Sequence, residues 1–128
     1  MSARASGRYV IQHHTGHGPE HWDLMLEDGD VLATWRLERP PSTDDDRPIP
    51  AVRIADHRKA FLTFEGPTRT GRGCVAIHRD GTFQTLHRTD DAWAFELQGD
   101  QLGGAFILER SEGHGDPPDR WVLRPQRR

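Results

Sequence analysis

Hydrophobic and polar residues alternate along short stretches of the chain, and glycine, proline or aspartate separates most of these stretches. Alternation with a period of two is typical of strands, whose successive side chains point to opposite faces of a sheet. No stretch shows a convincing amphipathic pattern with the period of an α-helix. We therefore expect strands over residues 9–12, 21–27, 31–37, 51–55, 60–66, 74–78, 82–88, 92–99, 104–110 and 120–125.

Two dipeptides between these stretches predict tight hairpins. Asp28-Gly29 precedes the stretch VLATWRL, and Asp80-Gly81 precedes TFQTLHR. Glycine adopts the positive φ that tight turns require, so neighbouring strands are expected to pair antiparallel. Many short strands with regular turn spacing predict an all-β, mainly antiparallel fold, a compact single-domain β-barrel with at most one or two short helices.

The length of the chain also indicates one domain, because 128 residues support a single hydrophobic core. We expect this domain to span residues 1–128, with a flexible tail at 1–7 and polar loops at 40–50 and 111–119. No apolar stretch approaches the roughly 20 residues of a membrane-spanning helix or forms the core of a signal peptide. Together with the single Cys74, which cannot form an internal disulfide, this predicts a cytoplasmic protein with no membrane partner.

Net charge limits the choice of partner. The formal net charge is -3, so a nucleic-acid ligand would have to be bound by a local basic patch. Arginine supplies nearly all of the positive charge, and its planar guanidinium group suits bidentate contacts to phosphate.

The stretch HHTGHGPEHWDLMLE, residues 13–27, contains half of the chain's eight histidines, followed closely by two carboxylates. If residues 21–27 form a strand, its apolar face consists of Trp22, Leu24 and Leu26. The opposite face then consists of His21, Asp23, Met25 and Glu27. An imidazole and two carboxylates therefore share one face of the strand.

This face predicts a metal site. His21 and Asp23 are two residues apart, so both can reach one ion, and the preceding loop can bring His13, His14 or His17 as a third ligand. Two imidazoles and one carboxylate suit Mn²⁺, Fe²⁺ or Zn²⁺. A solvated, histidine-rich loop that binds no metal is the alternative.

The ordered motifs YVIQHH, HWDLMLEDG, ADHRKAFLTFEG, GRGCVAIHRDGTF, GAFILER and RWVLRP resemble the 3′-phosphoesterase module of bacterial DNA ligase D, which also occurs as a free-standing protein. The resemblance extends from about Arg8 to Arg124. It implies a β-barrel that acts in DNA repair as a Mn²⁺-dependent nuclease and phosphatase. Such an enzyme removes ribonucleotides and phosphates from 3′ ends of DNA or of DNA/RNA primers and leaves a 3′-OH.

The resemblance also implies a ligand set for the metal. The family motif of a histidine, a short loop and then His-aromatic-Asp matches His14, His21 and Asp23. The loop between the two histidines is one residue longer than in the commoner family version, so His13 or His17 could replace His14. Mn²⁺ is the expected ion, with Zn²⁺ or Fe²⁺ also compatible with these donors.

Other positions are implied to contact the phosphate. His57, in Ala55-Asp56-His57, matches a family histidine that engages the phosphate, and Arg39 stands where the family has a lysine. A second family arginine has no strict match, and Arg53 and Arg47 lie close to its place. Further candidates for contacts to the substrate are Gln12, Arg36 and Arg69. Glu27 is a candidate for orienting a ligand histidine through its second nitrogen.

One position departs from the family. Two residues after the metal-binding aspartate the family has an arginine that contacts the scissile phosphate, and this chain has Met25. A thioether cannot neutralise phosphate charge. Either another arginine reaches the phosphate, or the activity is weakened or altered.

Two rival functions follow from these residues. A domain that has lost the arginine would bind DNA ends or a repair protein, such as a separate DNA ligase, without chemistry. Alternatively, His21 and Asp23 with a distant histidine, His57, His78 or His87, have the spacing of the facial triad of a non-haem iron oxygenase.

Overall fold

The computed structural model describes residues 6–68, 71, 73–99, 101–112 and 118–126. Its elements, in chain order, are β1 (Ser6–Thr15), β2 (His21–Asp28), β3 (Val31–Leu37), β4 (Ile49–Arg58), the 3₁₀ helix η1 (Lys59–Leu62), β5 (Gly66–Pro67), β6 (Cys74–Thr89), β7 (Ala92–Gln98), β8 (Gly104–Glu112) and β9 (Asp119–Pro125). The first strand begins at Ser6, inside the segment expected to be a tail. No helix among these residues is long and apolar enough to cross a membrane.

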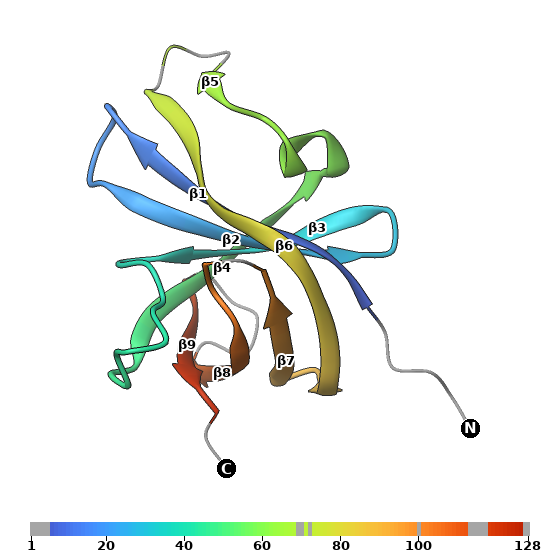
Figure 1. Ribbon diagram of the computed structural model, residues 1–128. Coiled ribbons are helices and arrows are strands. Elements are labelled where there is room, and N and C mark those ends of the chain that lie inside the picture. Colours follow the sequence, from blue (N-terminus) through green and yellow to red (C-terminus); the bar gives the residue numbers. More distant parts are fainter. Residues whose placement is uncertain (1–5, 69–70, 72, 100, 113–117, 127–128) are drawn as a thin grey trace.

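The strands form a closed antiparallel barrel (Figure 1). Within the described residues, eight strands follow one another in the order β1-β2-β3-β4-β9-β8-β7-β6, and β6 pairs with β1 to close the circle. The short strand β5 pairs with the outer end of β6. The predicted all-β barrel is confirmed, and so is the hairpin at Asp28-Gly29, where Gly29 has a φ of 62°.

The inward-facing residues form one core. Alternate positions of every barrel strand contribute to it, and its centre is aromatic. The Trp35 ring meets Trp93 and Trp121 edge to face, with ring centroids 5.9 and 5.6 Å apart. Edge-to-face contacts of this kind add to the hydrophobic gain from burying large rings. These three tryptophans are therefore structural.

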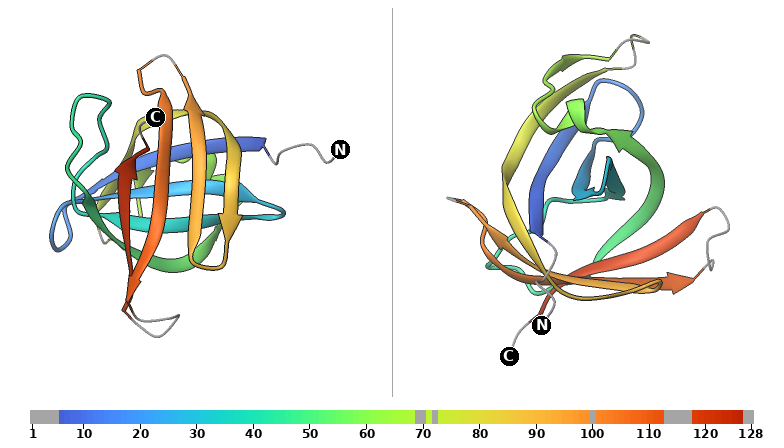
Figure 2. Two further views of the ribbon diagram at one scale, coloured as in Figure 1. Left: turned by 90° about the horizontal axis from the view of Figure 1, so that it is seen from below. Right: turned by 90° about the vertical axis from the view of Figure 1, so that its right-hand side faces the viewer.

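A second, smaller apolar cluster lies on the outer face of the barrel. Its buried members are Val10, Met25, Leu32 and Leu62, with Phe61 and Ile77 packed against them. Figure 1 and Figure 2 show the segment of η1 and β5 that covers this face on the side of the barrel opposite β7, β8 and β9. The outer face of β1 to β3 is therefore partly covered.

The predicted strand over residues 60–66 is wrong. Residues 59–62 form η1, and only Gly66 and Pro67 pair as a strand. The adjacent Phe61 and Leu62 both pack on the outer cluster. A strand would point consecutive side chains to opposite faces, whereas one helical turn lets both cover the same surface.

The predicted hairpin at Asp80-Gly81 is also wrong, because β6 continues through it from Cys74 to Thr89. Gly81 pairs with Tyr9 of β1, and its φ is not in the positive range. Glycine is required at position 81 for a different reason. A Cβ atom placed on Gly81 would lie 2.3 Å from the carbonyl oxygen of Gln98, so a close approach of two backbones excludes any side chain.

This explanation predicts the effect of adding one methyl group. Gly81→Ala should lower the free energy of unfolding by about 1–3 kcal/mol, because the strands must separate to admit the Cβ. Gly103→Ala is the matched control, since its Cβ would lie at an ordinary 3.7 Å from the Leu97 carbonyl oxygen. Urea denaturation of both variants measures the difference. Equal stabilities would show that the Gln98 carbonyl oxygen does not exclude a side chain at position 81.

Candidate active site

The candidate metal ligands lie on the outer face of the barrel, where β1 and β2 pair. The register places His14 opposite His21 and Gln12 opposite Asp23. The next pair along these strands, Ile11 and Leu24, points into the core. Strict alternation therefore brings His14, His21 and Asp23 together outside the barrel and not inside its mouth.

The His21 ring is oriented by the backbone of the loop before it. Its Nδ1 lies 3.1 Å from the carbonyl oxygen of Pro19. Because a carbonyl only accepts, Nδ1 carries the proton and Nε2 is left with its lone pair. That Nε2 lies 3.6 Å from Oδ2 of Asp23. A histidine whose second nitrogen is fixed by a carbonyl is the usual arrangement for a metal ligand.

His14 is the neighbouring histidine on this face. Its ring centroid lies 4.7 Å from that of His21, and its Nδ1 is buried without a hydrogen-bond partner among the described residues. Burial, and then the nearby His21, lower the pKa of His14, which favours the neutral form that binds metals. His13 points to the opposite face, where it stacks on Trp22, and His17 is exposed in the loop.

The donor atoms partly fit a divalent ion. Ligands about 2.1 Å from a tetrahedral ion stand roughly 3.4 Å from one another, close to the separation between His21 and Asp23. Oδ1 of Asp23 is buried and, like Nδ1 of His14, has no hydrogen-bond partner among the described residues. As they stand, however, no three His, Cys, Asp or Glu side chains in the described part of the chain are arranged to hold a metal ion. The described residues thus place two potential donor atoms, His21 Nε2 and Asp23 Oδ2, next to each other.

Arg36 supplies positive charge beside the carboxylate. It pairs with Asp23 across β2 and β3, and its Nε lies 3.7 Å from Oδ1 of Asp23. The Arg36 side chain is 51% exposed, so its guanidinium group can also reach a ligand in solvent. A guanidinium group in this position can bind the oxygens of an anion next to the metal ligands.

A bulge turns His57 to the same outer face. By simple alternation along β4, His57 would share the inner side with Ala51. One extra residue on β4, between the partners of Leu32 and Thr34, reverses this. Nδ1 of His57 lies 2.9 Å from the Ala55 carbonyl oxygen and 3.1 Å from Oγ1 of Thr34. Nδ1 therefore carries the proton, and Nε2 is left to exchange one.

Gln12 and Glu27 hold the covering segment in place. Gln12 is buried and donates from Nε2 to the carbonyl oxygen of Phe61 at 2.8 Å. Glu27 accepts from the backbone N–H of Arg8 at 2.6 Å and pairs with Lys59 at 3.2 Å. Burial opposes ionisation of Glu27, but these two partners outweigh it and lower its pKa. Neither side chain has a hydrogen bond to the candidate metal ligands among the described residues.

The structure does not bring the other candidate arginines to this site. Arg39 donates to the carbonyl oxygens of Arg47 and Pro48 in the loop before β4. Arg53 lies on the inner face, 4.5 Å from the centre of the Trp35 ring, and pairs with Asp56 at 2.8 Å. Arg69 lies outside the described residues.

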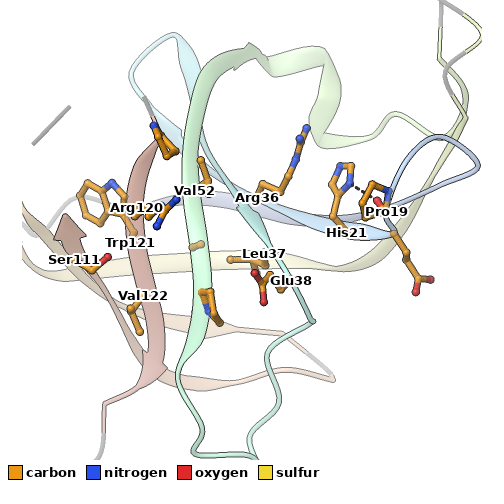
Figure 3. A pocket seen from close by; sticks show the side chains of 14 residues that line it. Pro19, His21, Arg36, Leu37, Glu38, Val52, Ser111, Arg120, Trp121 and Val122 are labelled. Atoms are coloured by element: carbon orange, nitrogen blue, oxygen red, sulfur yellow. Dashed lines mark hydrogen bonds between the residues drawn. The ribbon is translucent and has the colours of Figure 1, made fainter. Parts of the chain in front are cut away.

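A groove leads away from the site across the outer face. It has a volume of about 790 Å³ and crosses from His21 and Arg36, past Val52, to Arg120 and Trp121 (Figure 3). Sequence reasoning did not select Arg120, because only the pairing of β4 with β9 brings it near the other residues. No local pattern around Arg120 signals this position.

Comparison with known proteins decides the family. The model of the DNA ligase D 3′-phosphoesterase domain matches residues 11–110. The chain belongs to this family.

Individual members show how much of a longer protein the match covers. The multifunctional non-homologous end joining DNA repair protein LigD of Mycobacterium tuberculosis is 32% identical over 123 residues, covering 89% of this chain and 15% of that protein. The multifunctional non-homologous end joining protein LigD of Pseudomonas aeruginosa is 27% identical over 124 residues, covering 91% of this chain and 14% of that protein. The chain therefore spans about 15% of the length of these relatives.

Within this 3′-phosphoesterase-domain chain, Met25 has a structural role. It is fully buried in the outer apolar cluster with Val10, Leu32 and Leu62, the last of which belongs to η1. An arginine at this position would have to bury its charge or displace the covering segment. The charge next to Asp23 comes from Arg36 on the neighbouring strand.

Substitution of Met25 shows whether this position serves packing in the apolar cluster or is available for a phosphate contact. Met25→Arg should lower the free energy of unfolding by about 3 kcal/mol or more, because it places an unpaired charge in an apolar cluster. Met25→Leu, which keeps shape and polarity, should cost less than about 1.5 kcal/mol. Chemical denaturation measures both. A stable Met25→Arg variant would show that the cluster opens readily and that the position is available for a phosphate contact.

Proposed function

We propose that the protein is a metal-dependent 3′-phosphoesterase that removes 3′-phosphates and 3′-terminal ribonucleotides from DNA ends during DNA repair. The observation that carries this proposal is the pair formed by His21 Nε2 and Asp23 Oδ2, with Arg36 beside it, on the outer face of a domain of this family. The pair offers ligand atoms, and the guanidinium group offers a contact for the phosphate.

His14, His21 and Asp23 would hold the metal, with Mn²⁺ as the proposed ion and Zn²⁺ or Fe²⁺ compatible with the same donors. Such an ion, when bound, neutralises charge on a phosphoryl oxygen and makes a bound water more acidic. The His14 ring would rotate to complete the ligand set. This rotation breaks no hydrogen bond of Nδ1, because His14 Nδ1 has no partner among the described residues. Neutral His14 and a lone pair on His21 Nε2 both favour ligation.

The other groups would act on the substrate directly. Arg36 would bind the phosphoryl oxygens opposite Asp23 and so replace the arginine that Met25 excludes. His57, when both of its ring nitrogens carry a proton, would donate the proton of Nε2 to the departing oxygen, while Nδ1 stays hydrogen-bonded to Ala55 and Thr34. Thr34, which contacts His57 Nδ1, lies two residues before Arg36 on the same face of β3.

The proposed partners are 3′ ends of DNA or of DNA/RNA primers, and a DNA ligase that seals the 3′-OH product, in the same or a separate polypeptide. We place the activity in the cytoplasm, where a free and exposed thiol such as Cys74 stays reduced. The burial of Met25 supports a second candidate, a module that binds DNA ends without hydrolysing them. The phosphoesterase and the binding module differ only in whether the bound DNA end is hydrolysed.

Hydrolysis of a duplex primer with a 3′-phosphate or a single 3′-ribonucleotide tests the proposal. We expect release that depends on Mn²⁺ and falls by about 100-fold or more in both His21→Ala and Asp23→Ala, because each removes a metal ligand. His87→Ala is the matched control, an exposed histidine in the part of β6 that pairs with β7, and should retain full activity.

Three other outcomes would contradict the proposal. Release without a divalent ion would remove the metal from the reaction, and release unaffected by His21→Ala and Asp23→Ala would place the chemistry elsewhere. Binding of the primer without any release would favour the DNA-end binding module.

A further inference from the structure

We propose that the groove between β2 and β9 binds the DNA strand that carries the reacting 3′ end, with Arg36 and Arg120 holding its phosphate backbone. This inference rests on the proposed function and assigns a path to its substrate. The path begins at the candidate metal ligands, since His21 and Arg36 line the same groove.

The sheet register sets the geometry of this path. Asp23 pairs with Arg36, Arg36 with Val52, and Val52 with Arg120, so these four residues form one row across β2, β3, β4 and β9. Neighbouring strands lie about 4.8 Å apart, which separates the backbones of Arg36 and Arg120 by roughly 10 Å. A stacked strand advances about 3.4 Å per nucleotide, so the two arginines are about three nucleotides apart.

The lining of the groove suits a nucleic-acid strand. Val52 contributes apolar surface between the two arginines, as Figure 3 shows, whereas Trp121 lies in the core and only borders the groove beside Arg120. Strand-binding grooves in general combine such surface, on which sugars and bases rest, with cations that follow the backbone. Two carboxylates, Glu20 and Glu38, also line the groove. Their repulsion would direct phosphates toward the arginines.

The size of the groove argues for an extended ligand. A volume of about 790 Å³ is far larger than a single phosphate needs. The groove is also continuous with Arg36, which already lies 3.7 Å from Asp23. A strand entering past Arg120 would therefore bring its terminal phosphate to His21 and Asp23. An acidic peptide is the other ligand that two arginines could attract, and the experiment below distinguishes it.

Fluorescence anisotropy with a labelled, 3′-phosphorylated DNA strand, without added metal, measures binding separately from hydrolysis. Arg120→Glu and Val52→Glu should each raise Kd about tenfold, because they place negative charge in the path of the backbone. Arg120→Ala should also reduce the slope of log Kd against log salt concentration by about one. The Val52 variant keeps the test valid if the Arg120 variants fail to fold.

Arg124→Glu is the matched control. Arg124 lies on the same strand as Arg120, is exposed, and pairs with Glu109, but it does not line the groove. Its substitution should leave Kd unchanged. Equal effects of Arg124→Glu and Arg120→Glu would overturn the inference, because they would reveal only general electrostatic attraction. Wild-type protein that does not bind the strand, or that binds an acidic peptide more tightly, would overturn it as well.

The two proposals can fail independently. If wild-type protein binds the strand through Val52 and Arg120 but never hydrolyses it, the groove stands and the phosphoesterase proposal fails. If it hydrolyses 3′-phosphates and the groove variants bind and react normally, the proposed function stands and the strand follows another path.

Discussion

The antiparallel register of β1, β2 and β3 is the constraint on which the candidate site depends. It places His14 opposite His21, and Asp23 opposite Arg36, on the outer face of the sheet. A slip of one residue would turn these polar groups into the barrel and expose Ile11, Leu24 and Trp35, which are buried in the core. Folding of the barrel and assembly of the site are therefore the same event, because the core residues hold the register that the site needs.

The outer apolar cluster gives this face a second layer. Phe61 and Leu62 of η1 cover Met25, and the buried hydrogen bond from Gln12 to Phe61 fixes the cover next to Asp23. The His57 ring packs edge to face on Phe61, so the same segment also positions the proposed proton donor. Met25 stands where the resemblance implies an arginine, and it completes the apolar cluster. Positive charge is then supplied from β3 by Arg36, one strand away.

Much of the fold could be predicted from local patterns, and the failures share a physical cause. Alternation located the barrel strands, and Asp28-Gly29 marked a true hairpin. Asp80-Gly81 carries the same local signal. Gly81 is required there for another reason, because the Gln98 carbonyl oxygen, which is distant in sequence, leaves no room for a Cβ atom. The segment at 60–66 reads as a strand because its apolar content does not reveal which surface it will cover. In both places contacts distant in sequence override the local preference.

The residues of the site also divide into those that local sequence patterns predict and those that depend on distant contacts. The proximity of His21 and Asp23 follows from two positions on one strand, and their resemblance to a family motif pointed to His14. Arg53, close to Arg36 in the pairing of β3 with β4, lies on the inner face, and a bulge that the sequence does not signal turns His57 outward. Arg120 joins the row only because β9 pairs with β4. Residues on one strand could be grouped from the strand pattern, whereas Arg120, which only strand pairing brings to the row, could not.

Anomalous diffraction from crystals grown with Mn²⁺ would test the central claim most directly, since it locates the ion without relying on turnover. We expect one strong peak within bonding distance of His21 Nε2 and Asp23 Oδ2, with the His14 ring rotated to supply the third ligand. A peak at other residues, or no peak at saturating Mn²⁺, would contradict a metal centre on this face of the barrel.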